Sequence, residues 1–315
     1  MLFTFGEAML RYSPPAGERL ETADRFDVYL AGSESNVAAV AARLGVGAVW
    51  ASKLPDSPLG RHVESSLRSH GVDPAVSYTD RGRLGTYYVD PGGAPRGTDV
   101  VYDREMAPVR TATVDDLAVD RAESAEVVHT SGITPALSDT LATSTKEILA
   151  SASRAGATVS FDINYRSKLW STAAARETLT DLLQYVDLLT VATRDAEAVL
   201  DHEGDAVNVA ARLGNEYDIS TVVLTRSDAG AVAYEDGSVH EQAAFETETV
   251  DAIGTGDAFV GGFLVAFLEE GDVPGALEYA AATAALKRTI AGDVAVVTPE
   301  EVERVVGRKG GGILR

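Results

Sequence analysis

Residues 250–259 read VDAIGTGDAF and join an extended segment to a helix that we expect to begin at Asp257. Two glycines one residue apart let the backbone turn where a Cβ would clash, and the first amides of the helix are then free to face an anion. Such a turn suits phosphoryl transfer to a hydroxyl. The amides of Gly254, Thr255 and Gly256 would hold the developing charge while Asp257 accepts the hydroxyl proton. The stretch alone is equally compatible with a plain turn capped by Asp257.

A second stretch, AGSESNVA at residues 31–38, leads into an apolar helix that ends near Leu44-Gly45. Together with residues 251–257 it resembles the two signatures of the ribokinase-like (PfkB) carbohydrate kinases. Further blocks resemble the 2-keto-3-deoxygluconate kinase branch, in family order from the first residues almost to the last. They are FGEAMLR (5–11), SPP (13–15), VYDR (101–104), SGITP (131–135), DINYR (162–166) with Leu169-Trp170, LKRT (286–289) and Gly292-Asp293.

Extended apolar runs alternate with helical periods, which is typical of a parallel sheet covered by helices on both faces. The resemblance makes this a ribokinase-like three-layer α/β/α fold, with one kinase domain over residues 1–315. We expect strands at 2–5, 48–52, 127–130, 158–162, 188–192 and 221–225, and a hairpin at 231–234 and 239–242. Helices are expected at 35–44, 59–70, 141–154, 175–183, 206–216, 258–268 and 274–290.

Two segments break the alternation, at about residues 10–30 and 76–104. Each carries short alternating stretches with proline and glycine and has no long helical period. The resemblance implies that they pair into a small β-sheet lid over the sugar, which in this family often also supplies a homo-oligomer contact. Two separate surface excursions are the alternative.

Composition narrows the classes of protein. The 315 residues are 45% apolar, enough for a substantial core, and contain no cysteine, which excludes disulfides and thiolate metal sites. The start, MLFTF, reads as a strand rather than a leader, and the apolar run 259–268 is shorter than the roughly 20 residues that span a bilayer. We therefore expect a cytoplasmic protein without a membrane partner.

The charge balance is unusual. Aspartate and glutamate total 48 against 27 lysines and arginines, a formal net charge of −21. This excess argues against a nucleic-acid partner. The negative potential of the protein surface would also repel anionic substrates. Concentrated salt removes the difficulty, because the Debye length falls to about 3 Å at 1 M. We infer a halophilic archaeal host; an ordinary acidic mesophilic protein is the alternative.

Two arginines point to the substrate class. A sugar acid needs a fixed positive charge for its carboxylate, which a neutral sugar does not. Arg104 lies in the expected lid and Arg166 follows a strand end, where α/β sheets collect ligands. Surface salt bridges are the alternative for both. By resemblance, the sugar contacts are Gly32, Asn36, Tyr87 (or the adjacent Tyr88), Tyr102, Arg104, Ile133 and Arg166.

The resemblance also implies ATP and Mg²⁺. Nucleotide contacts are expected at Asn164, Thr225, Ser227, Gly230, Gly254 and Gly256, and there is no P-loop motif. The family's Asn-x-x-Glu element is altered here to Ala192, Thr193, Arg194 and Asp195, so only Asp195 carries over as a magnesium contact, through water. Asp251 corresponds to a position that helps to hold a monovalent cation such as K⁺ in several members. Satisfying turn amides is its alternative role.

These residues lead to one expected function and two rivals. The expectation is a kinase that transfers the ATP γ-phosphate to the C6 hydroxyl of 2-keto-3-deoxygluconate, in an Entner–Doudoroff-type route. A fructokinase on the same fold would make both arginines structural. A non-catalytic sugar-acid sensor would not need Asp257 beside an intact glycine turn. No residue is assigned to the hydroxyl at which the gluconate and galactonate epimers differ.

Overall fold

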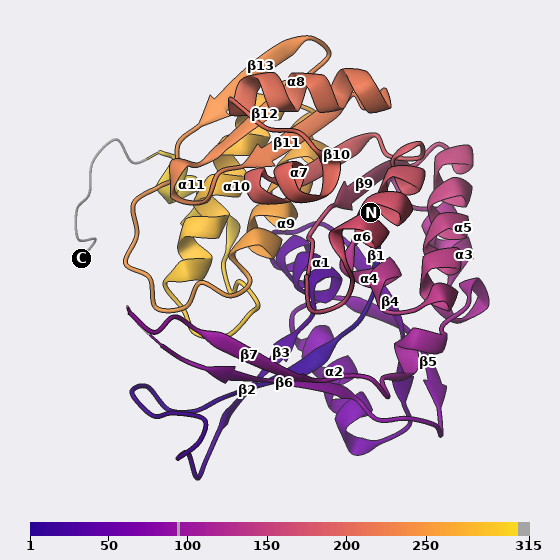
Figure 1. Cartoon of the computed structure of the whole chain (residues 1–315), viewed down its shortest axis with the longest axis vertical. Helices are drawn as coiled ribbons and strands as arrows, with labels where there is room; N and C mark the ends of the chain where they lie inside the picture. The colour runs from indigo at the N-terminus through magenta and orange to yellow at the C-terminus, as the bar shows by residue number, and fades with distance from the viewer. Residues whose placement is uncertain (93–94, 308–315) are drawn as a thin grey trace.

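The computed structural model describes residues 1–92 and 95–307, and its centre is a nine-stranded sheet (Figure 1). The strand order is β13-β12-β11-β10-β9-β8-β1-β4-β5. Every pair from β11 to β5 is parallel, and β12 and β13 form the antiparallel edge. The strands are β1 (Leu2–Phe5), β4 (Ala48–Pro55), β5 (Asp73–Thr79), β8 (Val127–Ser131), β9 (Thr158–Asp162), β10 (Leu188–Ala192), β11 (Thr221–Thr225), β12 (Ala231–Glu235) and β13 (Ser238–Gln242).

Alternating side chains of these strands supply two separate cores, one on each face of the sheet. Leu2 packs into the first core, whereas its neighbour Phe3 packs into the second. The expected three-layer α/β/α arrangement is therefore confirmed. The first core is covered by α1 (Ser33–Arg43), α2 (Pro58–Ser69), α9 (Thr255–Glu270), α10 (Val273–Arg288) and α11 (Pro299–Val306). The second is covered by α3 (Val119–Glu123), α5 (Asp139–Ala155), α6 (Thr172–Leu183), α7 (Thr193–Leu200) and α8 (Ala206–Tyr217).

Short helices complete the chain: α4 (Ile133–Ala136), η1 (Pro108–Thr111), η2 (Val114–Leu117) and η3 (Ser227–Ala229). The expected strands and long helices lie within a few residues of the observed ones. One boundary has consequences for the site, because α9 begins at Thr255 rather than at Asp257. Within the described part of the chain, no helix has both the length and the apolar character needed to cross a membrane.

A second sheet of four strands, in the order β3-β2-β6-β7, lies at the bottom of the view in Figure 1. Its strands are β2 (Met9–Ser13), β3 (Asp27–Ala31), β6 (Gly85–Asp90) and β7 (Asp99–Asp103). The two segments do pair with each other, so the interpretation as separate surface excursions is wrong. Residues 93–94 of the expected lid lie outside the described residues. An oligomer contact through this lid stays a prediction.

The second lid segment begins later than expected. Residues 76–79 belong to β5, which pairs with β4 at the edge of the large sheet. The first lid strand of this segment, β6, begins only at Gly85. Most of β5 is partly exposed, because it is an edge strand with a neighbour on one side only. It therefore lacks the continuous apolar run that identifies the central strands.

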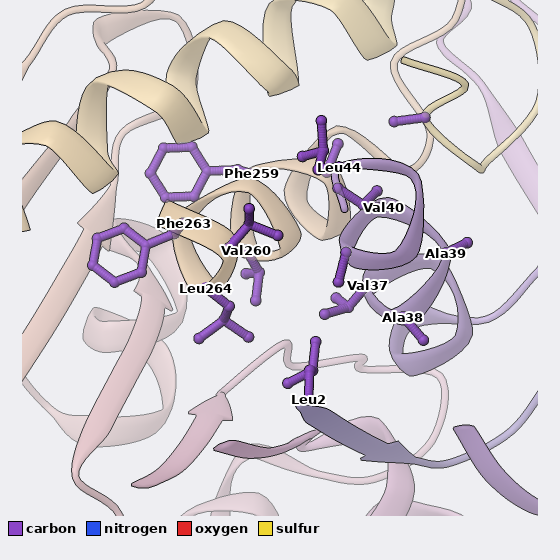
Figure 2. Close-up of a cluster of buried hydrophobic side chains, with 14 of the residues drawn as sticks. Leu2, Val37, Ala38, Ala39, Val40, Leu44, Phe259, Val260, Phe263 and Leu264 are labelled. Carbon is purple, nitrogen blue, oxygen red and sulfur yellow. The ribbon is translucent and has the colours of Figure 1, made fainter. Parts of the chain in front are cut away.

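Helices α1 and α9 lie side by side (Figure 2), and Val37 and Val40 of α1 share one core with Val260 and Leu264 of α9. Their close approach depends on Gly261. An added Cβ at this glycine would lie 2.7 Å from the Cβ of Val40. The contact matters for function, because the two helices begin at the two stretches that carry the kinase signatures.

The acidic composition leads to a first prediction. We expect the melting temperature and the enzymatic activity to rise from low salt to molar KCl, since salt screens the repulsion within a chain of net charge −21. Thermal unfolding and turnover in KCl and NaCl series would measure this. The two salts should act alike if screening is the cause. A flat response in both would support an ordinary acidic protein instead.

Candidate active site

A cavity of about 1190 Å³ lies between the lid and the carboxyl ends of the central strands. Asp162, Ala192 and Thr225, the last residues of β9, β10 and β11, line it from the large sheet. Met9, Tyr87 and Tyr102 line it from the lid. This is the usual place for a ligand in an open α/β sheet. The predicted site residues that share its wall are Gly32, Asn36, Tyr87, Tyr102, Arg104, Ile133, Asn164, Arg166, Asp195, Thr225, Ser227, Gly230, Gly254, Thr255, Gly256 and Asp257.

The glycine turn at the start of α9 has the shape expected of an anion hole. Gly254 is the N-cap with φ 84°, a conformation that favours glycine, and a Cβ there would collide with the carbonyl oxygen of Asp293. The first helical hydrogen bond runs from Ala258 N to Gly254 O, at 2.9 Å. The amides of Gly256 and Asp257 therefore precede the hydrogen-bond ladder and are available to an anion.

The carboxylate of Asp257 is held from helix α1. Ser33 Oγ donates to its Oδ1 and Asn36 Nδ2 donates to its Oδ2, each at 2.7 Å. Asn164 Nδ2 in turn donates to Ser33 Oγ, at 3.0 Å. Asp257 is not the helix cap, which is Gly254, so the plain capping interpretation is wrong. A carboxylate fixed at the mouth of an anion hole is arranged to take a proton from a bound hydroxyl.

Burial raises the pKa of Asp257 above its usual range. Hydrogen bonds from Asn36 and Ser33 oppose this rise, as do the positive charges of Arg166 and Lys287. Burial thus strengthens Asp257 as a base, while its partners keep the carboxylate form available.

Two further carboxylates lie near the ends of neighbouring strands: Asp162 is the last residue of β9, and Asp195 lies in the first turn of α7, which follows β10. Burial, together with the negative charges of Asp257 and Asp195, raises the pKa of Asp162 to about 8. Burial also raises the pKa of Asp195, whose oxygens accept from Tyr165 N and Arg194 Nε at 3.3 Å each. Clustered carboxylates that repel one another fit a divalent cation or its water shell. Among the described residues no group of three acidic or histidine side chains is arranged as a metal site.

The pKa of Asp162 predicts a pH dependence of stability. A carboxyl whose folded pKa is about 8, against an ordinary 3.8, stabilises the fold while protonated. That contribution is complete below pH 4 and is lost as pH rises to about 8. We expect Asp162→Asn to make the decline in unfolding free energy over this window shallower, by up to about 1.4 kcal/mol per pH unit. Denaturant unfolding of both proteins without nucleotide would measure it, and parallel profiles would contradict it.

The two arginines predicted to bind a substrate carboxylate, Arg104 and Arg166, differ in their ion pairing. Arg104 forms a buried ion pair with Glu7 and lies 5.3 Å from the centre of the Tyr102 ring. Its charge is therefore already compensated, and the pair is buried rather than on the surface as the alternative had it. Arg166 Nη1 donates to the carbonyl of Tyr165 at 3.1 Å, and among the side chains that the structure describes no carboxylate forms an ion pair with it. Arg166 is the better candidate for a substrate carboxylate.

Asp251 lies behind the glycine turn rather than in the cavity wall. Its carboxylate accepts from Ile253 N at 3.0 Å and from Gly292 N at 3.1 Å, and it pairs with Arg11 Nη1 at 2.8 Å. The structure thus gives its side chain the turn-amide role. The cation role stays a prediction and is taken up below.

Arg11 also links the lid to the body of the protein. It lies on lid strand β2 and pairs with Asp293 at 3.0 Å, while Tyr87 of β6 donates to the other carboxylate oxygen of Asp293. Burial raises the pKa of Asp293 to about 6, against the opposing charge of Arg11. Because the carbonyl of Asp293 packs against Gly254, these contacts connect the lid directly to the anion hole.

Several residues of the site carry no role in the sequence-based prediction: Glu7, Ser33, Asp162, Lys287 and Asp293. All lie within blocks that carry the family resemblance. Apart from these blocks, the only feature that marks these residues in the sequence is that each is a polar residue near an apolar run. Only the fold shows that helix α1 and strand β9, distant in sequence, meet at Asp257.

The profile of the pfkB family carbohydrate kinases matches residues 1–300. This chain belongs to that family. The kinase is 56% identical over 314 residues to a 2-dehydro-3-deoxygalactonokinase of Haloferax volcanii, covering 100% of this chain and 99% of the relative. It is 29% identical over 310 residues to a 2-dehydro-3-deoxygluconokinase of Thermoproteus tenax, covering 97% and 94%.

A solved structure gives the same result for the fold. The crystal structure of a 2-dehydro-3-deoxygluconokinase from Thermotoga maritima superposes on the kinase with a TM-score of 0.91 at 34% identity, covering 98% of both chains. The ribokinase-like fold expected from the sequence is thereby confirmed, and so is the membership of the family.

Proposed function

We propose that the kinase transfers the γ-phosphate of ATP to the C6 hydroxyl of a 2-keto-3-deoxy sugar acid. The observation that carries the proposal is the Asp257 carboxylate, which Ser33 and Asn36 hold beside the free amides at the start of α9. In this position Asp257 accepts the proton of the hydroxyl. The amides of Gly256 and Asp257 would face the negative charge that grows on the phosphoryl group. Of the predicted anion-hole donors, the amide of Thr255 is already engaged, because it donates to the carbonyl of Ala252 at 3.3 Å.

Magnesium would enter with the nucleotide. Asp162 and Asp195 would hold its water shell, because both are acidic and both line the cavity. The metal supplies charge neutralisation on the phosphates when bound. Thr225, Ser227 and Gly230 line the same cavity near the end of β11 and would border the nucleotide.

Arg166 supports an acid rather than a neutral sugar. A guanidinium in the cavity wall that no described carboxylate pairs with is suited to a substrate carboxylate. The rival is a fructokinase, and Fructokinase-1 of Zea mays is 28% identical to this chain over 266 residues. A neutral sugar would leave Arg166 without an ion pair, because the nearby carboxylates of Asp257, Asp162 and Asp195 affect it only through their charge, and this favours the acid. A sensor without turnover has no use for the fixed base.

The relatives change the preferred epimer. The sequence pointed to 2-keto-3-deoxygluconate, whereas the Haloferax relative, at 56% identity, is named for the galactonate compound ("2-dehydro" and "2-keto" denote the same group). The relatives named for gluconate in Thermoproteus tenax and Bacillus subtilis are 29% and 28% identical. We therefore propose 2-keto-3-deoxygalactonate as the preferred substrate, with the gluconate epimer second.

The test is sugar-dependent ADP release at molar KCl with magnesium. Both 2-keto-3-deoxy epimers, fructose and ribose would be offered side by side. We expect both acids to be turned over, the galactonate epimer with the higher kcat/KM, and the neutral sugars poorly. Preference for gluconate would overturn only the epimer assignment. Preference for fructose would overturn the role of Arg166.

A further inference from the structure

Lys287 is fully buried near the end of α10, beneath the anion hole. Its Nζ donates to the backbone oxygen of Asp251 at 3.1 Å and to that of Ile290 at 3.4 Å. Burial lowers the pKa of its ammonium, and the carboxylates of Asp251 and Asp293 oppose that effect. A buried charge is costly unless protein groups replace its water, and here backbone carbonyls do so.

The two carbonyls belong to the segments that build the anion hole. Asp251 opens the turn that leads to Gly254. Ile290 opens the segment that leads to Asp293, whose own carbonyl packs against Gly254. The ammonium of Lys287 therefore joins both sides of the turn, and Lys287 is not among the residues that line the cavity.

A monovalent cation at Asp251, which the family resemblance implies, does not fit the residues present. The carboxylate of Asp251 is engaged by two amides and Arg11, and its carbonyl accepts from Lys287. A potassium ion bound to this carbonyl would lie beside an ammonium of the same charge. Like charges a few ångströms apart repel strongly where water is excluded.

We propose that Lys287 is a tethered monovalent cation of the anion hole, so that the kinase requires no K⁺ at this position. Lys287 is a positioning residue: it holds the carbonyls of Asp251 and Ile290 and thereby fixes the amides that follow Gly254. The charged groups around it are Arg11, Asp251, Asp293 and Asp257. The proposal deepens the proposed function and rests on phosphoryl transfer at this turn.

A cation exchange series tests this directly. At constant molar chloride, KCl or NH₄Cl would replace NaCl, and kcat and melting temperature would be measured for wild type, Lys287→Met and Lys287→Ala. Wild type should show no preference among the cations. Lys287→Met should lose about 10- to 100-fold in kcat, less than the loss of a whole oxyanion-hole donor, with KM for the sugar little changed. In Lys287→Ala, K⁺ or NH₄⁺ should restore part of the loss.

Lys53→Met is the matched control, because Lys53 is also mostly buried and pairs with Asp116 at 3.0 Å, outside the cavity wall. It should behave as wild type in every salt. Saturable activation of the wild type by K⁺ over Na⁺, at unchanged melting temperature, would overturn the proposal even if the Lys287 variants fail to fold. So would near-normal kcat in Lys287→Met.

The test separates this proposal from the substrate assignment. The series is run with whichever of the four sugars is turned over. A wrong sugar assignment then appears as turnover of another sugar, with the cation response still as predicted.

Discussion

Replacing Asp257 with asparagine should lower kcat by about 10²- to 10⁴-fold, the usual contribution of a positioned general base. Asparagine keeps the size of the side chain, and its amide can still bond Asn36 and the Ser33 hydroxyl, which both donates and accepts. Sugar and nucleotide should therefore bind with near-normal affinity. Coupled ADP release and calorimetric titration of the same preparation would measure the two properties.

A second aspartate at a helix start provides the matched control. Asp272 is the N-cap of α10 and accepts from Gly275 N at 2.8 Å. Asparagine caps helices as well as aspartate does, so Asp272→Asn should keep both activity and stability. Near-normal turnover in Asp257→Asn would exclude Asp257 as the base. Loss of sugar binding along with turnover would instead assign it a binding role.

Replacing Arg166 with glutamine should cost the acid substrate about 10- to 100-fold in kcat/KM, the worth of a charge-assisted hydrogen bond of about 1.5–3 kcal/mol. Turnover of fructose, however slow, should change far less, because a neutral sugar does not use the charge. The measurement is the ratio of kcat/KM for the acid to that for fructose, in wild type and variant.

Arg121→Gln is a suitable control, since Arg121 pairs with Asp73 on the surface, away from the cavity. Equal losses of kcat/KM for the acid and for fructose in Arg166→Gln would mean that Arg166 positions the site in general and does not bind the substrate carboxylate. Arg104 is a poor choice for this experiment. Its removal would leave Glu7 buried without a partner, which typically costs about 3–5 kcal/mol of stability.

The parts of the fold that sequence predicts well are those where burial is complete. Strand β9 is bounded correctly, because TVSFD is a run of apolar and small residues buried between two helical layers. For β5 the prediction is wrong over residues 76–79, which it places in the lid, because half-exposed edge residues carry no such run. Within the site, the glycine turn and its aspartate are visible locally, since their chemistry lies within a few neighbouring residues.

Long-range contacts explain what the sequence could not provide. Lys287 lies in the last turn of the alanine-rich helix α10 and resembles a lysine that faces solvent at a helix end. It is nevertheless fully buried, and its ammonium donates to the carbonyls of Asp251 and Ile290. Arg104 appeared available to a substrate, because its partner Glu7 lies 97 residues away. Ion pairs of this kind depend on which strand ends meet, and a single sequence does not record that.

The contacts of Asp293 with Arg11 and Tyr87 have a consequence for the catalytic cycle. Both partners lie on lid strands, whereas Asp293 supports the turn at Gly254. Any hinge motion that admits a sugar by lifting the lid must separate buried charges behind that turn. Closure over the sugar would restore them. Such coupling would tie phosphoryl transfer to occupancy of the acceptor site and would disfavour hydrolysis of ATP by water while the lid is raised.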